Sequence, residues 1–387
     1  MGGSRTRRRL SRREFLRLAA AAGTTLGVAA AGGADAARGT GKLDGSERHA
    51  RGAPEVRAYD TAELAYLAAA RPSSPARPAT VAAEVPPSMR YANPVIADDC
   101  PDPHVIQDGA TFYLVATSHV LPAFPIRVSR DLVNWQRTAA SVFTRDNAPA
   151  WASDHFWAPE LHRVGGRYVC YYTARSRRTD RLCIGAAVAP TPFGPYRDLG
   201  RPLLEAEVTV LDPTFFRDDD GRQYLYWKAD AADGDPSGPI RVQELTPDGL
   251  ALVGDASEVL RNDAEWEGAL VEGPSVIKRG GAYYLFYSGG AYDTPWYAVG
   301  VARSLSPTQG FRKRGEPILR SGARWRGPGH NSVVRHQEQD YIVFHAWEGE
   351  RFRGVRSGLI DRLDWQRDGW PGVNDGTPRE AWPPAGA

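Results

Sequence analysis

The sequence predicts an all-β protein folded as a five-bladed β-propeller. A self-similar unit recurs five times after residue 91, and most copies carry four strand-like segments. No copy shows the long 3.6-residue apolar period of an amphipathic helix. The rival all-β fold, a β-sandwich, does not repeat one four-strand unit five times.

Each unit begins at an anchor residue that is followed by a short strand-like segment. The anchors lie 54 to 61 residues apart, at Pro103, Pro159, Pro213, Pro274 and His330. A turn rich in Gly and Asp follows in the first four copies, whereas the fifth has Glu338-Gln339. An aromatic strand comes next, for example residues 112–115 or 283–287.

The third and fourth strands of the units follow the aromatic strand. Third strands are expected at residues 126–129 and 182–188, for example. Fourth strands are expected in the first four copies, near Val142, Leu203, Val259 and Ile318. Cys170 and Cys183 lie on two strands joined by one turn, so a disulfide across that hairpin stays an open alternative, and Cys100 is left over.

The N-terminal residues predict export. Residues 1–37 combine the pair Arg12-Arg13, followed by Phe-Leu, with an Ala-rich apolar run and a small-residue cleavage site, as in a twin-arginine signal peptide. The apolar run is too short to span a bilayer comfortably. Residues 38–90 are a Pro- and Ala-rich linker, and residues 91–387 are the propeller. The expected product is secreted, extracellular, monomeric and free of the membrane after cleavage.

The charge balance excludes one class of partner. The formal charge of the 387-residue chain is only +2, and the positive excess is concentrated before residue 18. Nothing therefore predicts binding to nucleic acid. The 11 Trp and 16 Tyr residues can stack on sugars, although most are expected to fill sheet cores.

Three carboxylates lie at, or directly before, one position of the repeat. Asp102 and Asp212 directly precede their anchors, and Glu272 lies two residues before its own. Because the first strand of each propeller blade lines the central channel, these three side chains should converge at one mouth. Clustered carboxylates suit metal binding or the acid/base hydrolysis of glycosides, and ligands from three separate units favour the second chemistry.

Eight motifs in chain order give the sequence a resemblance to glycoside hydrolase family 43 from Tyr91 to Asn374. These motifs are Asn93-Pro94-Val95-Ile96, Pro101-Asp102-Pro103, residues 129–135, Phe156-Trp157-Ala158-Pro159-Glu160, Leu211-Asp212-Pro213, Val271-Glu272-Gly273-Pro274, Gly327-Pro328-Gly329-His330 and Asp368-Gly369-Trp370-Pro371. The resemblance implies an inverting glycosidase in which Asp102 is the base, Asp212 tunes the acid's pKa, and Glu272 is the acid. Inversion predicts that the Asp102 and Glu272 carboxyl groups lie about 6.5–9.5 Å apart.

Four further residues are weaker candidates. Trp157 either stacks on a sugar or packs at a blade joint, and Arg356 either binds a substrate hydroxyl or is structural. His330 matches a family position near a structural Ca²⁺, although no cofactor is required for the chemistry. Glu160 is expected in a structural ion pair. The implied substrate is an oligo- or polysaccharide with arabinofuranosyl linkages; a β-xylosidase, an endo-arabinanase and a non-catalytic sugar-binding propeller are the alternatives.

Overall fold

The computed structural model of the protein describes residues 89–232 and 234–382. The signal peptide predicted for residues 1–37, and all but the last two residues of the predicted linker, lie outside the described residues. Across the described ranges, the structure contains no helix with the length and apolar character needed to cross a membrane.

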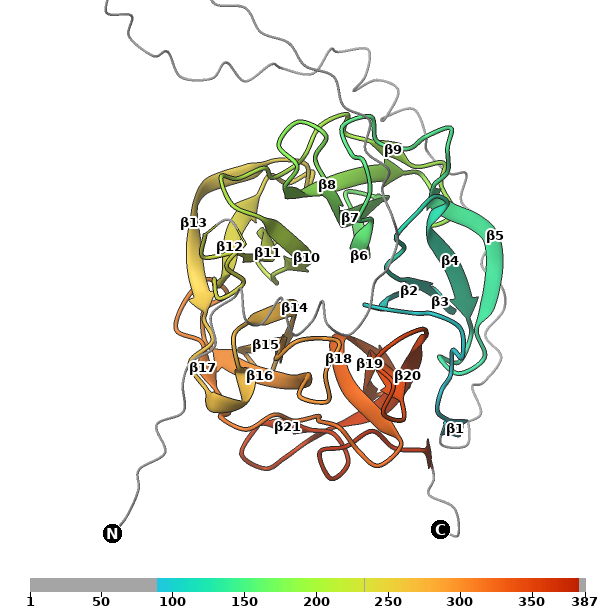
Figure 1. Cartoon of the computed structure of the whole chain (residues 1–387), viewed down its shortest axis with the longest axis vertical. Coiled ribbons are helices and arrows are strands. Elements are labelled where there is room, and N and C mark those ends of the chain that lie inside the picture. Colours follow the sequence, from blue (N-terminus) through green and yellow to red (C-terminus); the bar gives the residue numbers. More distant parts are fainter. Residues whose placement is uncertain (1–88, 233, 383–387) are drawn as a thin grey trace, which may run out of the picture. The chain divides into compact units, whose positions relative to one another are not determined.

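Five four-stranded antiparallel sheets form the blades of a propeller (Figure 1). The first blade comprises β2 (His104–Asp108), β3 (Thr111–Val115), β4 (Ala123–Ser129) and β5 (Gln136–Phe143). The second comprises β6 (Trp157–Val164), β7 (Arg167–Arg175), β8 (Leu182–Ala189) and β9 (Arg197–Asp198). The third comprises β10 (Val210–Arg217), β11 (Gln223–Ala229), β12 (Ile240–Leu245) and β13 (Leu252–Leu260). A 3-10 turn, η1 (Glu265–Glu267), leads to the fourth blade.

The last two blades have the same order. The fourth comprises β14 (Val271–Arg279), β15 (Ala282–Gly289), β16 (Ala298–Ser304) and β17 (Arg312–Lys313). The fifth comprises β18 (Trp325–His336), β19 (Gln339–Glu348), β20 (Arg356–Trp365) and β21 (Pro371–Gly372). The five-bladed prediction is confirmed, because each repeat of the sequence forms one sheet whose strands follow chain order.

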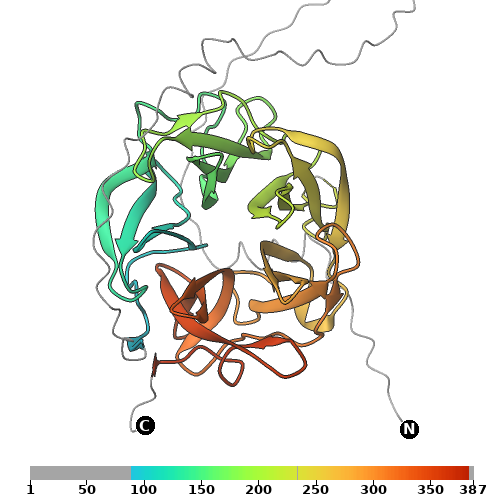
Figure 2. The same ribbon diagram turned by 180° about the vertical axis from the view of Figure 1, so that it is seen from behind.

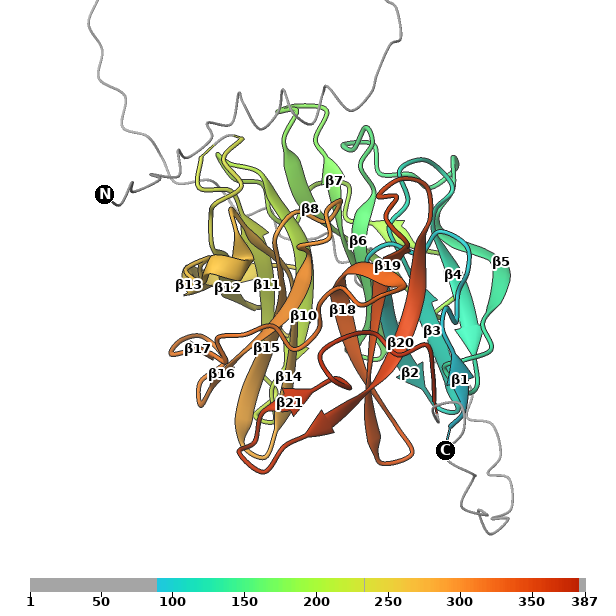
Figure 3. The same cartoon turned by 60° about the horizontal axis from the view of Figure 1, so that its bottom comes forward.

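The innermost strands of the blades form a closed ring around the central axis. Each of β2, β6, β10, β14 and β18 contacts the innermost strand of the next blade, and β18 returns to β2. Figure 1 shows these inner strands around the centre, and from behind the orange-red last blade lies beside the cyan first blade (Figure 2). Figure 3 shows the same blades in a tilted view. The beginnings of β2, β6, β10 and β14 and the middle of β18, at His330, therefore face one common space.

The hydrophobic core is divided into five clusters, one between each pair of neighbouring blades. The second strand of each blade has almost all of its residues buried, as in β7, where Tyr168 to Ala174 are all buried. Both faces of a blade pack against neighbours, so these strands read as continuous apolar runs rather than alternating ones. This packing explains most of the aromatic residues without assigning them to sugars.

A short two-stranded sheet joins the two ends of the described chain. β1 (Tyr91–Ala92) pairs with β22 (Ala381–Trp382), so that Tyr91 lies opposite Trp382. The Tyr91 hydroxyl donates to the buried Asp361 carboxylate on β20 at 2.8 Å. The side chain of Asn93 donates to the backbone oxygens of Ile360 and Arg379, both at 2.9 Å, and accepts the Ile360 N–H at 3.0 Å. These contacts fasten both ends to the fifth blade.

Two expectations about the strands need correction. Val142 and Val259 lie on fourth strands as predicted, whereas Leu203 and Ile318 follow β9 and β17. Gly200 and Gly315, at φ 75° and 103°, interrupt the outer strands there. After the interruption, the backbone N–H groups of Leu203 and Ile318 each rejoin the third strand through a 2.8 Å hydrogen bond. The short β21 of the fifth blade was not predicted.

The disulfide alternative is excluded by the strand register. Cys170 lies opposite Ala187, and Cys183 lies opposite Ala174, so the two cysteines are offset along the hairpin. Cys100, Cys170 and Cys183 are all free thiols and are buried.

Candidate active site

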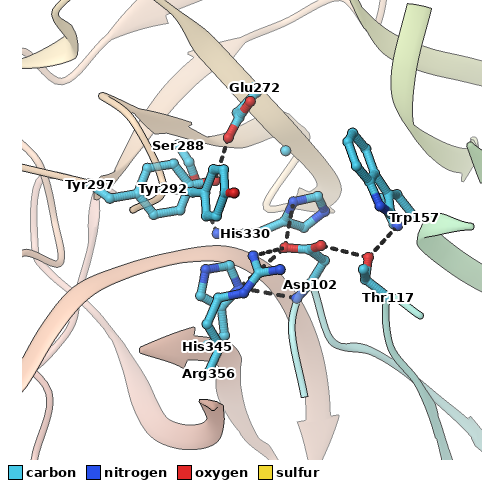
Figure 4. Close-up of polar contacts among 12 residues, drawn as sticks. Asp102, Thr117, Trp157, Glu272, Ser288, Tyr292, Tyr297, His330, His345 and Arg356 are labelled. Atoms are coloured by element: carbon cyan, nitrogen blue, oxygen red, sulfur yellow. Dashed lines mark hydrogen bonds and ion pairs between the residues drawn. The ribbon is translucent and has the colours of Figure 1, made fainter. Parts of the chain in front are cut away.

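The six residues predicted for the site come together around one pocket of about 120 Å³. Its lining residues are Asp102, Thr117, His119, Trp157, Leu211, Asp212, Glu272, Tyr292, His330 and Arg356. They come from all five blades, and Figure 4 shows polar contacts around Asp102 and Glu272.

Backbone conformation aims these side chains into the pocket. Asp102, Ala158, Asp212 and Gly273 share a repeat position and have φ values of 53°, 41°, 56° and 55°. In the second to fourth blades the pairing register shifts at this point, as at a β-bulge. A left-handed residue at a bulge re-aims the neighbouring side chains, and Asp tolerates this conformation better than most residues.

Asp102 is surrounded by hydrogen-bond donors and cations. Its Oδ2 accepts the Thr117 hydroxyl at 2.6 Å, and its Oδ1 lies 3.3 Å from the Arg356 guanidinium and 3.4 Å from Nδ1 of His330. Burial disfavours the charged carboxylate, but the Arg356 guanidinium, followed by His330, outweighs burial and holds the pKa of Asp102 well below its usual range. Asp102 is therefore ionised at neutral pH.

Asp212 and Glu272 have the opposite electrostatic character. Burial, followed by the negative charge of Asp102, raises the pKa of Asp212 to about 7. Burial, followed by the negative charge of Asp212, raises the pKa of Glu272 to about 7. Asp212 accepts the Gly273 N–H at 3.0 Å and lies near the cationic Lys228, both of which favour its charged form. Glu272 in turn accepts the Tyr297 hydroxyl and lies near His330, and both favour its charged form. The pair therefore shares a proton at neutral pH.

Two positioning groups were not assigned a site role from the sequence. The Tyr297 hydroxyl donates to Oε1 of Glu272 at 2.9 Å, and its ring stacks on His345. His345 accepts the backbone N–H of Asp102 at 3.0 Å, and burial lowers its pKa to about 4, which keeps it a neutral acceptor. A Cβ at Gly329 would lie 2.0 Å from the Tyr297 ring, so this glycine makes room for it. The sequence shows the glycine at position 329, but only the fold shows that the Tyr297 ring packs against it.

The three weaker assignments can now be placed. Trp157 lies in the pocket wall, where its indole N–H donates to His119 at 3.1 Å. Arg356 is 8% exposed and lies under the ring of Tyr292, so its guanidinium reaches both the pocket and Asp102. Nδ1 of His330 faces Asp102 and, at 3.9 Å, Asp212. Their roles toward substrate or metal stay predictions, as does the separation of the Asp102 and Glu272 carboxyl groups.

Glu160 lies away from this pocket in a buried cluster with His104 and His162. Its carboxylate accepts the His162 ring N–H at 2.7 Å and the Phe215 backbone N–H at 3.1 Å. Among the described residues, this cluster alone brings three potential metal ligands together. Nδ1 of His104 already accepts the Leu161 N–H at 3.2 Å, which places the ring proton on Nε2, the nitrogen that faces Glu160. A protonated nitrogen cannot ligate, so these contacts describe a structural link between blades.

An ionised carboxylate and a protonated one, facing the same pocket from different blades, can act together as a base and an acid. Glycosidic hydrolysis needs this pair, with one group activating water and the other protonating the leaving oxygen. The propeller and this pocket thus define the class of glycoside hydrolases.

Comparison with known proteins gives the family. The sequence profile of glycosyl hydrolases family 43 matches residues 91–371, and the chain belongs to this family. Catalysis in this family proceeds with inversion. An extracellular exo-α-(1→5)-L-arabinofuranosidase of Cellvibrio japonicus is 28% identical over 313 residues, covering 72% of this chain and 87% of the relative. A protein of the same name from Streptomyces chartreusis is 30% identical over 284 residues, covering 69% and 85%.

A solved structure agrees with this assignment. The crystal structure of a thermostable family-43 glycoside hydrolase matches with a TM-score of 0.68 at 32% identity, covering 73% of this chain and 96% of that one.

Proposed function

We propose that this protein is a secreted exo-α-L-arabinofuranosidase that removes terminal arabinofuranosyl groups from arabinan or arabinoxylan. The pocket of about 120 Å³ supports exo action, because it is small compared with the several hundred Å³ of typical ligand sites and fits one sugar better than a chain. The names of the two relatives described above support the sugar and the extracellular location.

The observation that carries the proposed chemistry is the opposite pKa shift of Asp102 and Glu272 in one pocket. Asp102, ionised at neutral pH, accepts a proton from water as the water oxygen attacks the anomeric carbon. Thr117 and Arg356 hold this carboxylate in place through their bonds to its two oxygens. The glycosidic C–O bond breaks as Glu272 gives its proton to the departing oxygen.

Asp212 and Tyr297 keep the acid ready for this step. The charge of Asp212 raises the pKa of Glu272, so that Glu272 retains a proton at neutral pH. The hydroxyl of Tyr297 fixes the direction of the carboxyl group. Between turnovers, Glu272 regains a proton from solvent, and Asp102 releases the one it took from water.

We propose that no cofactor takes part, because the chain supplies the base, the acid and the charge that tunes the acid. Calcium prefers six to eight oxygen ligands. The contacts of His330 with Asp102, Asp212 and Ser288 offer too few for a site made by protein groups alone. The metal role of His330 stays a prediction, and no step depends on it.

Hydrolysis of a substrate panel tests the function. The protein should release arabinose from nitrophenyl α-L-arabinofuranoside, arabinan and arabinoxylan, and NMR of the first product should show the inverted anomer. Nitrophenyl β-D-xyloside should be a much poorer substrate. A preference for the xyloside would favour the β-xylosidase alternative, and release of internal oligosaccharides from arabinan would favour endo action.

A further inference from the structure

The loop between β15 and β16 faces two hollows. Tyr292 on this loop lines the catalytic pocket, whereas Trp296 lines a second hollow of about 680 Å³. The remaining residues of the second hollow are Trp266, Pro295, Ala298, Pro317, Arg320, Ser321, Arg326, Glu350 and Phe352. Four residues of chain span at most about 14 Å. One loop therefore contributes a wall to both hollows, through residues whose Cα atoms lie within about 14 Å of each other.

Trp296 presents an uncovered aromatic surface in this hollow. Its side chain is 76% exposed, the highest value among the exposed aromatic residues of the described chain. Phe352 and Pro295 extend the apolar surface. Exposed apolar surface of this kind marks a binding site when it lies in a concave region. A flat indole face suits the C–H face of a sugar ring, and its area is gained at low cost in side-chain entropy.

The rim of the hollow offers groups that bind hydroxyls. Arg320, Arg326 and Glu350 carry charges of both signs, and Arg326 lies 4.0 Å from Glu350 in an exposed and therefore weak pair. Such groups can donate to and accept from the hydroxyls of a neutral ligand without losing a strong partner. An apolar floor with a mixed polar rim matches a saccharide better than an apolar or strongly anionic ligand.

The loop that carries Trp296 is held rigidly. Ser321 donates to the Pro295 carbonyl at 2.6 Å, and Trp347 donates to the Tyr292 carbonyl at 2.9 Å. Gly327, at φ 54°, allows close packing, because a Cβ there would lie 2.7 Å from the Thr294 carbonyl oxygen. A fixed aromatic surface loses little entropy when it binds a ligand.

We propose that this hollow is a second carbohydrate-binding site that holds a neutral, pentose-containing polysaccharide chain beside the catalytic pocket. The proposal rests on the function proposed above and deepens it. The small pocket takes one terminal sugar, and the hollow holds a further part of the same polymer. Its effect should therefore appear with polymers and vanish with small substrates.

Substitution of Trp296 tests the proposal through binding. In the full chain with Asp102→Ala, which prevents digestion of the polymer, migration is measured in native gels that contain arabinan or arabinoxylan. Adding Trp296→Ala should weaken binding about five- to tenfold, the range of one aromatic contact. Leu305→Ala is the matched control, because Leu305 is 85% exposed on the same blade but does not line the hollow. It should leave binding unchanged.

Kinetics separate this site from the catalytic pocket. In the otherwise unchanged chain, Trp296→Ala should raise KM for arabinan about fivefold and leave kcat/KM on nitrophenyl arabinofuranoside within about twofold. Equal gel binding with and without Trp296, or an equal loss on both substrates, would overturn the proposal. Binding that 0.5 M NaCl abolishes would do so too, since it would show attraction of a charged polymer. Failure of the proposed function would give a different result, because the unchanged protein would then hydrolyse no pentoside.

Discussion

Asp102 and Glu272 differ in their surroundings, so substituting each should reduce hydrolysis in a different pattern across substrates. Asp102→Ala removes the proposed base and should abolish hydrolysis of every substrate. Glu272→Ala removes the proposed acid, so arabinan should lose about 10²–10⁴-fold in rate, whereas a nitrophenyl glycoside, whose leaving group needs no proton, should lose far less. Rates on both substrates, with exposed Glu265→Ala as control, measure this difference.

The opposite pattern would contradict these roles. If Asp102→Ala retained activity on the nitrophenyl glycoside while Glu272→Ala lost both substrates equally, the labels of acid and base would have to be exchanged. Circular dichroism should first show that each variant is folded.

The pH profile reports the charge of Asp212. The pKa of Glu272 is raised to about 7 by burial and by the negative charge of Asp212, so kcat/KM should fall on the alkaline side as the pH passes about 7. Asp212→Asn removes that charge, the pKa of Glu272 falls, and the alkaline limb should move to lower pH. The exposed Asp220→Asn on the same blade should leave the limb in place. An unmoved limb in Asp212→Asn would show that burial alone sets this pKa.

At the scale of the strand, the same left-handed backbone position carries a carboxylate in some blades, at Asp102 and Asp212, and no functional group in another. Ala158 occupies it in the second blade at φ 41° and carries no functional group. A non-glycine residue in this conformation costs roughly 1–2 kcal/mol. The second blade therefore keeps the strained backbone conformation although its residue at this position has no carboxylate.

Ala158→Gly measures this strain. Loss of a buried methyl group costs about 0.8 kcal/mol, and glycine adds about 0.5–1 kcal/mol in entropy, but relief of the left-handed strain offsets both. The free energy of unfolding should therefore change by less than about 0.8 kcal/mol in either direction. Ala174→Gly, fully buried on β7, has no such relief and should cost about 1–2 kcal/mol. Denaturant unfolding compares the two, and equal losses would disprove the strain.

At the scale of the whole molecule, a propeller must close its ring, and Asn93 contributes to the closure. Asn93→Ala leaves the buried N–H and C=O groups of Ile360 without this partner, which should cost about 2–4 kcal/mol. Thermal unfolding should show a clear fall in Tm. Asn262→Ala, which loses one exposed bond to Gly268, is the control and should change Tm little. A similar Tm for both variants would show that closure depends on the blades alone.

Export is also a property of the whole chain, and its proposed signal lies outside the described residues. Arg12→Lys combined with Arg13→Lys should retain the folded protein inside the cell if a twin-arginine signal directs it outward. Immunoblots of culture medium and cells measure the distribution. Unchanged secretion by the double variant would refute this route, though not secretion itself.

The sequence by itself determined the five blades and the three carboxylates. Both are local or periodic: each blade repeats one pattern of turn and aromatic strand, and Asp102, Asp212 and Glu272 recur beside its anchor. A repeat that forms a ring brings equivalent positions to one axis, so the convergence of these residues followed from periodicity alone.

Only the tertiary structure decided how these groups differ chemically. A pKa depends on distances between charges and on burial, and the partners are far apart in the chain: Arg356 is 254 residues from Asp102. No sequence motif predicts the contacts of Tyr297 and His345 or the hollow beside Trp296. The broken outer strands were missed because their hydrogen bonds resume after a glycine turn. These features arise from packing between blades, which no repeat pattern encodes.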